Sequence, residues 1–435
     1  MSNSRCWMGA LAALAALSAA SDLWAAEAKL QFTPDNLAID PGPVCIPRSR
    51  SIQGLPAPAA PLKGQPKLVS ANPRFFEIRL GPDQATHALI LDESKGTGTG
   101  YDRLYLDAEA TGNLADAKPV TGQCRTEGNQ ASCLFKDCQA LVNYGGQRLP
   151  WRFDAFACTD TSLGWIKPQT VLTVCPFGYY GGTIQIDGQT VRAAVVDAAC
   201  TGRYDEPLDL GRLALGSDGG LDLPGSQVLL DLNGDGRFDV SGPEAFPCTR
   251  YVQLNGTYYS MAVAPNGQSL TLAKSKVPQG TIERERGGRF TLGLVSSECG
   301  MVTVMCEGEP AKLPAGRYRL LWCSLALSRA DGATWQATGK GSEKGSEIVV
   351  AADAPTRLKL GPPLVLSATV DAASQGRPDA VRPGTELSLG IDVYGQAGER
   401  YPSGVLRQGR SPEPPTVRVL AANGKVIEKG SFRFG

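Results

Sequence analysis

Oxygen-bearing side chains alternate along one short stretch, "DLNGDGRFD", which covers residues 231–239. With Asp231 as position 1, positions 1, 3, 5 and 9 carry oxygens and position 6 is glycine; these residues are Asp231, Asn233, Asp235, Asp239 and Gly236. A hard cation such as Ca²⁺ takes about six to eight oxygens, and a short loop supplies them from side chains 1, 3 and 5 and from the backbone carbonyl at position 7, here Arg237. The spacing therefore predicts a calcium-binding loop. A bare β-turn is the alternative, because Asp, Asn and Gly also favour tight turns.

The stretch resembles the calcium loops of EF-hand, dockerin and thrombospondin type 3 repeats, which it matches at positions 1, 3, 5, 6 and 9. It departs from them at position 12, where Gly242 replaces the bidentate acid and Glu244 is the nearest substitute. Pro224-Gly225 before the loop and Gly242-Pro243 after it argue against flanking helices. The resemblance implies structural Ca²⁺ held by six residues, which are Asp231, Asn233, Asp235, Arg237, Asp239 and Glu244.

Three weaker copies of the loop occur, each after a β-rich run such as "ALIL" or "AAVV". They are "DESKGTGTGYD" (92–102), "DAEATGNLAD" (107–116) and "DAACTGRYD" (197–205). We expect them to be turns, although Asp197 and Asp205 could complete the coordination of the main loop if the two loops lie side by side. The pattern predicts a duplicated unit of two strand-and-loop elements. Over roughly residues 70 to 280 the chain resembles secreted bacterial β-repeat proteins with D-x-N-x-D-G loops.

Turn dipeptides between short alternating runs indicate the elements that carry these loops. Asp187-Gly188, Asn255-Gly256, Asn266-Gly267 and Asn423-Gly424 are hairpin signals, and no sustained helical period is present. The chain is therefore predicted to be mainly β. Residues 312–328 resemble an edge hairpin of small immunoglobulin-like sandwiches. The expected divisions are a signal peptide (1–28), a proline-rich arm (29–69), two β repeat units (70–128 and 129–280, the second with the calcium-type loop), a β-sandwich module (281–361) and a C-terminal β module (362–435).

The N-terminus and the cysteines indicate a compartment. Arg5, an apolar run over residues 9–20 and the A-x-A motif at residues 26–28 are typical of a signal peptide, which predicts a periplasmic or extracellular protein. No later apolar run is long enough to span a membrane. Eleven cysteines follow Cys6. In an oxidising compartment they are expected to form disulfides with one thiol left over.

The net charge and the missing catalytic motifs limit the classes of function that the sequence allows. The 43 basic and 43 acidic residues cancel, so neither nucleic acid nor an anionic membrane is an expected partner. His87 is the only histidine and is expected at the surface or at a strand end. Serine-hydrolase, phosphate-loop and zinc-protease motifs are missing from the sequence, which leaves a carboxylate-based hydrolase as the remaining catalytic class.

We therefore predict a non-enzymatic, exported scaffold or cell-surface protein. The alternative is a carbohydrate- or peptide-binding module with a polysaccharide partner, which would use exposed aromatics in "CPFGYYGG" (175–182) and "GTYYS" (256–260). The oligomeric state is not indicated by the sequence.

Overall fold

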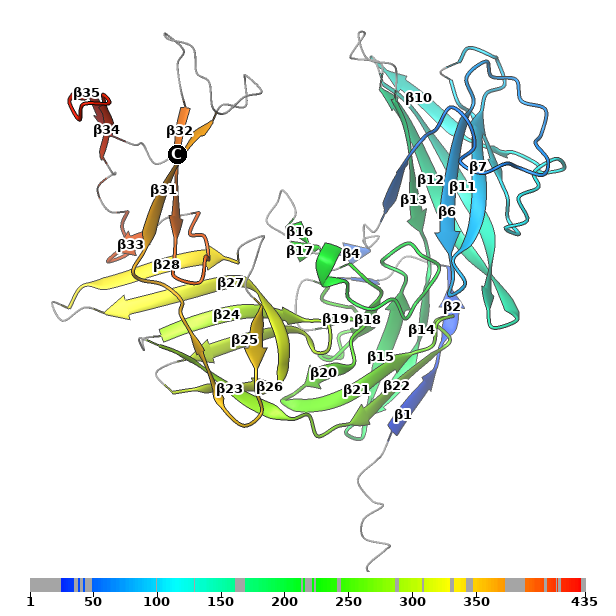
Figure 1. Cartoon of the computed structure of the whole chain (residues 1–435). Helices are drawn as coiled ribbons and strands as arrows, with labels where there is room; N and C mark the ends of the chain where they lie inside the picture. The colour runs from blue at the N-terminus through cyan, green and yellow to red at the C-terminus, as the bar shows by residue number, and fades with distance from the viewer. Residues whose placement is uncertain are drawn as a thin grey trace, which may run out of the picture. The chain divides into compact units, whose positions relative to one another are not determined.

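The computed structural model in Figure 1 describes residues 25–431 except 35–37, 40–41, 44–48, 99, 129, 161–168, 213, 216–220, 223, 241–243, 286–288, 307–308, 329–331, 342–346, 372–387, 403–404, 412 and 414–415. Antiparallel strands and turns make up nearly all of this part, with one short 3-10 helix, η1 (Leu210–Arg212). The prediction of a mainly β protein is confirmed. The chain forms two compact units, Met1–Lys276 and Val277–Gly435.

Two sheets pack around the first core of the N-terminal unit. The four-stranded sheet has the order β6 (Arg74–Leu80), β7 (Ala85–Asp92), β8 (Arg103–Leu106), β9 (Val120–Thr121). The five-stranded sheet has the order β10 (Gln123–Glu127), β11 (Gln130–Tyr144), β12 (Gln147–Asp160), β13 (Gln169–Pro176), β5 (Arg50–Gln53). Alternate side chains point inward, as the two-residue period of a strand requires. Phe76 and Leu89 of one sheet pack with Phe135, Phe153 and Val174 of the other.

A second pair of sheets encloses the other large core of this unit. The five-stranded sheet has the order β19 (Ala245–Pro247), β18 (Gln227–Leu230), β15 (Gln189–Val196), β14 (Tyr179–Ile186), β2 (Gln31–Thr33). The four-stranded sheet has the order β1 (Ala25–Lys29), β22 (Ser269–Lys274), β21 (Thr257–Val263), β20 (Tyr251–Leu254). Ile184, Val195 and Val228 pack against Leu254 and Leu272. Smaller hairpins are formed by β3 (Ala38–Ile39) with β4 (Gly42–Pro43) and by β16 (Ala214–Leu215) with β17 (Leu221–Asp222).

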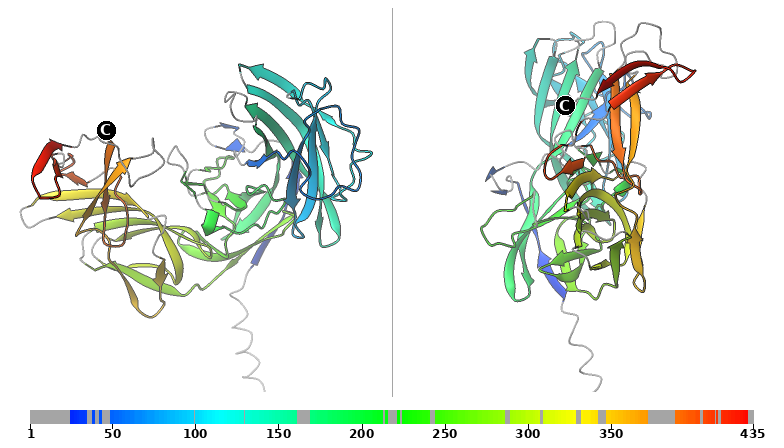
Figure 2. Two further views of the ribbon diagram at one scale, coloured as in Figure 1. Left: turned by 45° about the horizontal axis from the view of Figure 1, so that its top comes forward. Right: turned by 90° about the vertical axis from the view of Figure 1, so that its left-hand side faces the viewer.

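The two pairs of sheets share one order of connection. Each has a hairpin (β6–β7 or β14–β15), then a loop, a strand (β8 or β18), a second loop and an edge strand (β9 or β19). An antiparallel meander follows in both cases, and an N-terminal strand pairs with its last member, β5 with β13 and β1 with β22. Figure 2 shows these strands in two further views. The four loops singled out in the sequence therefore occupy matching places.

Two expectations about the start of the chain change. Residues 26–28, expected to be a cleavage site, lie within β1, where Ala28 is buried in the second core. The expected arm over residues 29–69 contributes β2 and β5, each of which pairs with a sheet of the N-terminal unit. Strand pairing supplies the hydrogen bonds that an isolated arm would have to find in water. The residues before Ala25 lie outside the described part.

Two of the predicted hairpin turns, Asp187-Gly188 and Asn255-Gly256, are confirmed by their backbone angles. Asp187 and Gly188 both have positive φ, at 50° and 82°, and so do Asn255 and Gly256, at 48° and 79°. This is the conformation of a type I′ turn, whose twist matches that of the strands it joins. Asp187-Gly188 joins β14 to β15, and Asn255-Gly256 joins β20 to β21.

The C-terminal unit has one main core. A three-stranded sheet has the order β26 (Ala311–Pro314), β23 (Gln279–Arg284), β30 (Pro355–Leu358), with β23 and β30 parallel. A larger sheet has the order β25 (Gly300–Cys306), β24 (Arg289–Ser296), β27 (Gly316–Ser328), β28 (Thr334–Lys340), β33 (Val405–Arg407), and β29 (Ile348–Val350) pairs with β27. Two hairpins complete the unit, β31 (Val365–Asp371) with β32 (Ser388–Tyr394), and β34 (Thr416–Leu420) with β35 (Val426–Ser431).

The expected separation into modules 281–361 and 362–435 differs from this arrangement. Leu364, Val393, Tyr401 and Val405 from the last segment pack on the same core as Phe290 from β24. Because they share this core, the two segments are parts of one unit. The expected boundary between residues 128 and 129 likewise falls in the turn between β10 and β11.

Candidate functional site

Each of the four loops begins with a buried acid directly after a strand. β7, β8, β15 and β18 are followed by the acids Glu93, Asp107, Asp197 and Asp231, which are all 5% exposed or less. In the first three loops the carboxylate accepts the backbone N–H groups of the residues four and five positions further on: Thr97 and Gly98, Thr111 and Gly112, Thr201 and Gly202. Each acid thus closes its own loop, which satisfies N–H groups that turn inward.

Left-handed backbone at positions 4 and 6 produces this closure. φ is positive at both positions in all four loops: Gly96 and Gly98, Ala110 and Gly112, Cys200 and Gly202, Gly234 and Gly236. The first loop therefore begins with Glu93 and has the same spacing as the others, whereas the sequence suggested a longer loop starting at Asp92. The Asp92 carboxylate instead accepts the N–H groups of Val69 and Ser70.

The loop at 231–239 places three oxygen-bearing side chains on one turn. Asp231 Oδ1 accepts the Gly234 N–H at 2.8 Å and Oδ2 accepts the Gly236 N–H at 3.0 Å. Asn233 Oδ1 accepts the Asp235 N–H at 2.8 Å, and Asn233 Nδ2 donates to Asp235 Oδ2 at 3.1 Å. Asn233 and Asp235 are exposed. Asp235 Oδ1 accepts the Arg237 N–H at 2.8 Å, so the two side chains are bonded to each other and to the turn's backbone at the surface.

Glu244 occupies a different place from an EF-hand acid at position 12. It is 2% exposed, and both of its oxygens are used by backbone N–H groups. Oε1 accepts from Leu232 at 2.9 Å and from Asn233 at 3.0 Å, while Oε2 accepts from Asp239 at 2.8 Å. Glu244 therefore ties the two ends of the loop together, a role that sequence spacing did not indicate. Gly242 and Pro243 lie outside the described residues.

A buried ring and a cation support the back of this loop. Phe238, at position 8, is 1% exposed and packs with Ala194, Val196 and Leu229. Arg192 lies over the Phe238 ring at 5.5 Å and donates to the carbonyl oxygen of Gly236. Positions 8 of the loops at 107 and 197, Leu114 and Tyr204, are buried in the same way.

The described residues contain no group of three or more His, Cys, Asp or Glu side chains arranged to hold a metal ion. The predicted donors of the 231–239 loop are of a mixed kind, the carboxylates of Asp231, Asp235 and the half-buried Asp239, the amide of Asn233 and the backbone carbonyl of Arg237. This mixture suits Ca²⁺, which accepts carboxylate, amide and carbonyl oxygens alike. Asp231, Asn233 and Asp235 fit such an ion. Both carboxylate oxygens of Glu244 already accept backbone N–H groups, as those of Asp231 do.

The loop at 197–205 does not complete the main loop. Asp197 Oδ2 accepts the indole N–H of Trp151 from β12 at 2.9 Å. Burial raises the pKa of this carboxyl to about 6, against the opposing effect of its three N–H donors. Asp205 is bonded to Arg203, with Oδ1 to Nε at 2.9 Å. The expectation that Asp197 and Asp205 coordinate an ion in the loop at 231–239 is therefore wrong, because Trp151 and Arg203 are the partners of these carboxylates.

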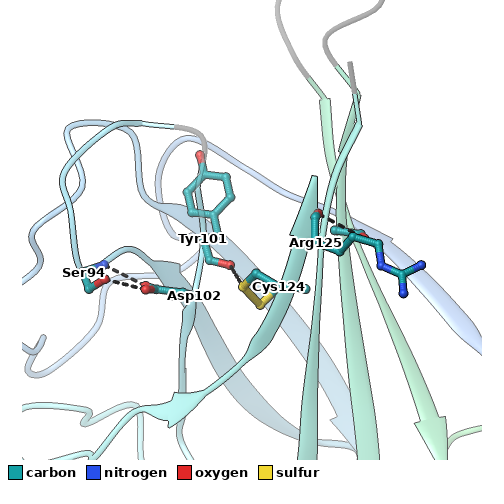
Figure 3. Close-up of a disulfide and its surroundings, with 7 residues drawn as sticks. Ser94, Tyr101, Asp102, Cys124 and Arg125 are labelled. Carbon is teal, nitrogen blue, oxygen red and sulfur yellow. Dashed lines mark hydrogen bonds between the residues drawn. A yellow bond between two sulfur atoms is a disulfide. The ribbon is translucent and has the colours of Figure 1, made fainter. Parts of the chain in front are cut away.

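A hollow of about 290 Å³ lies beside the loop at 93–102, next to the disulfide between Cys124 and Cys133. Figure 3 shows the surroundings of this disulfide, where Ser94 donates its backbone N–H and its hydroxyl to Asp102 and the Cys124 sulfur faces the Tyr101 carbonyl. Lys95 and Arg125 also line the hollow. Its mixed charges favour no single ligand class.

His87 differs from the expectation of a surface residue. It is fully buried in β7, and its Nδ1 lies 2.9 Å from the Asp107 carbonyl oxygen, a contact in which Nδ1–H donates. Nε2 is buried with no hydrogen-bond partner among the described residues. Burial lowers the pKa of the imidazole. His87 thus anchors the loop that starts at Asp107.

Of the five aromatics proposed for ligand binding, two are core residues, and Phe177, Tyr179 and Tyr258 are half-buried. Tyr180 is 7% exposed and Tyr259 is 4% exposed, and both belong to the second core. Tyr259 also donates its hydroxyl to Asp187 at 2.7 Å. Tyr180 and Tyr259 are therefore not accessible to a ligand.

The cysteines also differ from expectation. Cys124 and Cys133 are direct cross-strand partners, with Cα atoms 4.0 Å apart, and form the one disulfide of the described residues. Six other cysteines are thiols: Cys138, Cys158, Cys248, Cys299, Cys306 and Cys323. They are divided among different cores, and Cys306 and Cys323 lie on opposite sides of β24. A disulfide needs adjacent Cβ atoms. Cys45 lies outside the described part.

No family model, curated protein or solved structure matches this chain. Within the described residues, no helix is long and apolar enough to cross a membrane.

Proposed function

We propose that the protein is an exported, non-enzymatic scaffold of β-sandwiches and that the loop at 231–239 binds Ca²⁺ as a structural ion. The observation that carries the proposal is the arrangement of Asp231, Asn233 and Asp235 on one turn. The Asp231 carboxylate is buried at the start of the turn, and the side chains of Asn233 and Asp235 are exposed beside it. Bound calcium would screen the repulsion between these carboxylates and hold the turn that follows β18.

The two sandwiches of the N-terminal unit and the N-terminal segment support two further parts of the proposal, a duplication and export. We infer that the two sandwiches of the N-terminal unit descend from one duplicated element, because their strand order, loop positions and loop closure agree. The signal-like N-terminus supports export. Removal of a leader would occur before Ala25, because β1 pairs along its whole length with β22.

The calcium proposal is tested by thermal unfolding with millimolar calcium and with chelator. An ion that binds only the folded state raises the free energy of unfolding by RT ln(1 + [L]/Kd), about 0.4–1.4 kcal/mol for free calcium at about 1 to 10 times Kd. Without an acid ligand at position 12, we expect Kd of about 10⁻⁴–10⁻³ M. Wild-type protein should therefore melt at a higher temperature in calcium.

Asp235→Asn is the discriminating variant. Asn keeps an oxygen for the hydrogen bond from the Arg237 N–H but removes one charge from the ion site, so the calcium effect should shrink while stability in chelator stays near wild type. Asp209→Asn is the matched control, since Asp209 is also an exposed turn residue whose Oδ1 accepts a backbone N–H, from Gly211. The proposal fails if wild-type protein melts at one temperature in both conditions, or if both variants respond to calcium equally.

A further inference from the structure

Four asparagine–glycine pairs occur in the chain, and their hydrogen bonding differs. They are Asn233-Gly234, Asn255-Gly256, Asn266-Gly267 and Asn423-Gly424. Such a pair can react with itself, because the glycine nitrogen follows the asparagine directly and no Cβ on the glycine hinders its approach to the asparagine side chain. The reaction needs a glycine N–H that is open to solvent and a peptide group that can rotate. Hydrogen bonds to these groups therefore decide which pair reacts.

Three of the four pairs are restrained at both residues. The glycine N–H donates a hydrogen bond of 2.8 Å in each, from Gly234 to Asp231, from Gly267 to Ala264 and from Gly424 to Ala421. The asparagine Oδ1 in each accepts the backbone N–H two residues further on, at 2.8, 3.0 and 3.1 Å for Asn233, Asn266 and Asn423. Rotation of the peptide group breaks the first bond, and movement of the side chain breaks the second.

The pair Asn255-Gly256 lacks both restraints. It forms the exposed type I′ turn between β20 and β21. Neither the Asn255 side chain nor the Gly256 N–H has a hydrogen-bond partner among the described residues. The space that a Cβ on Gly256 would enter is open. Water therefore reaches this pair, and its peptide group can rotate without breaking a hydrogen bond of its own.

Exposure alone does not distinguish the pairs. Asn233, Asn255 and Asn423 are all exposed. Asn423-Gly424 also lies in the turn of a hairpin, between β34 and β35. It is the matched comparison for Asn255-Gly256, because it has the same dipeptide, a similar element and a similar exposure but keeps both hydrogen bonds.

We propose that Asn255 is the site at which the folded protein deamidates. The Gly256 nitrogen attacks Cγ of Asn255, the Cγ–Nδ2 bond breaks, and Nδ2 leaves as ammonia with the proton of the Gly256 N–H. This closes a succinimide ring. Water then opens the ring at either carbonyl carbon and gives aspartate or isoaspartate, so that one water is consumed and one ammonia released. The site depends on neither the loop at 231–239 nor calcium.

The products alter a hairpin that contributes to the second core. β20 and β21 carry Val252, Leu254 and Tyr259 into this core. Both products add a negative charge at the turn. Isoaspartate also lengthens the main chain within a two-residue turn, whose twist has to match that of its strands.

The experiment is peptide mapping by mass spectrometry after incubation of the full chain in heavy-oxygen water, once native and once in denaturant. Each site that reacts during the incubation takes up a labelled oxygen. In native protein Asn255 should react about tenfold or more faster than Asn423, because two hydrogen bonds of ordinary net strength restrain Asn423. In denaturant the four pairs should react at similar rates. Equal native rates at Asn255 and Asn423, or the same preference for Asn255 in denaturant, would overturn the proposal.

Isoelectric focusing of Asn255→Asp and Asn423→Asp gives a second readout. Aspartate tolerates the left-handed backbone at position 255 as asparagine does, and each variant starts one charge more acidic than wild type. On incubation of native protein, wild type and Asn423→Asp should gain an early acidic band, whereas Asn255→Asp should gain none at the same stage. An early acidic band in Asn255→Asp at the wild-type rate would contradict the assignment.

Discussion

At the scale of single residues, buried polar groups with unusual surroundings are the informative features. The His87 ring is buried, and its Nδ1–H donates to the Asp107 carbonyl oxygen. Burial lowers the pKa of the imidazole, because protonation would place a charge in the core. Glu93 and Glu244 are buried carboxylates that accept several backbone N–H groups. These groups hold loops in place.

His87 predicts a pH dependence of stability. Its folded pKa lies below the ordinary value of 6.5, so the unfolded chain binds a proton that the native state does not, and the free energy of unfolding falls as pH drops below about 6.5. The slope from this one group is at most about 1.4 kcal/mol per pH unit. His87→Asn keeps a donor for the Asp107 carbonyl and removes the titration. Denaturant unfolding of both proteins between pH 7.5 and about 5 should show a smaller decline for the variant; parallel curves would contradict the assignment.

At the scale of elements, the loops link strands that are far apart in the sequence. Asp197 joins the end of β15 to Trp151 of β12, and the Thr201 carbonyl accepts the N–H of Gly81 at 2.8 Å. Tyr144 of β11 donates its hydroxyl to the Gly202 carbonyl. The loop at 197–205 therefore braces the first sandwich against the second.

Removal of the Asp197 carboxylate tests this brace. Asp197→Ala leaves the Thr201 N–H, the Gly202 N–H and the Trp151 indole N–H without their acceptor, so we expect a loss of about 3 kcal/mol in the free energy of unfolding at pH 7.5. Asp205→Ala removes only a partly exposed ion pair with Arg203 and should cost about 0.5 kcal/mol.

A double-mutant cycle with Trp151→Phe separates the bridging bond from the loop's own bonds, since a direct contact gives a coupling energy of about 0.5 kcal/mol or more. Additive losses in urea unfolding would show that Asp197 acts only within its loop.

At the scale of the whole molecule, separate hydrophobic cores stabilise the fold, and the described residues form the one disulfide Cys124–Cys133. Each of the three large cores draws on at least two sheets. Burial raises the pKa of Cys138, Cys248 and Cys323 to about 12, and it also raises the pKa of Cys299 and Cys306. These thiols are packing groups of the cores.

The different burial of the thiols predicts how fast each reacts with a disulfide reagent. In native protein at pH 8, a disulfide reagent should react quickly with Cys158, which is partly exposed, and slowly with the five buried thiols, because attack needs an accessible thiolate. After denaturation without reductant, all six should react. Peptide mapping should find Cys124 joined to Cys133. A single reactive thiol in the denatured protein would contradict the structure and support extensive disulfide pairing.

Local patterns in the sequence were sufficient for the secondary structure and for the loops. Alternating apolar residues and Asp-Gly or Asn-Gly pairs determine strands and hairpins through interactions within a few residues. The glycine at position 6 and the acid at position 1 likewise specify each loop locally. The identity of the first acid in the loop at 93 was missed, because Asp92 and Glu93 are adjacent and only the contacts of each carboxylate distinguish them.

By itself, then, the sequence determined a mainly β protein and four acid-led loops, since backbone conformation and turn chemistry act over short distances. Only the tertiary structure decided which side chains meet. It assigned Glu244 to backbone N–H groups, Asp197 to Trp151 and His87 to the core, and it separated most of the cysteines. It also brought Trp322 beside Gly293, because strand register places residues together that are distant along the chain.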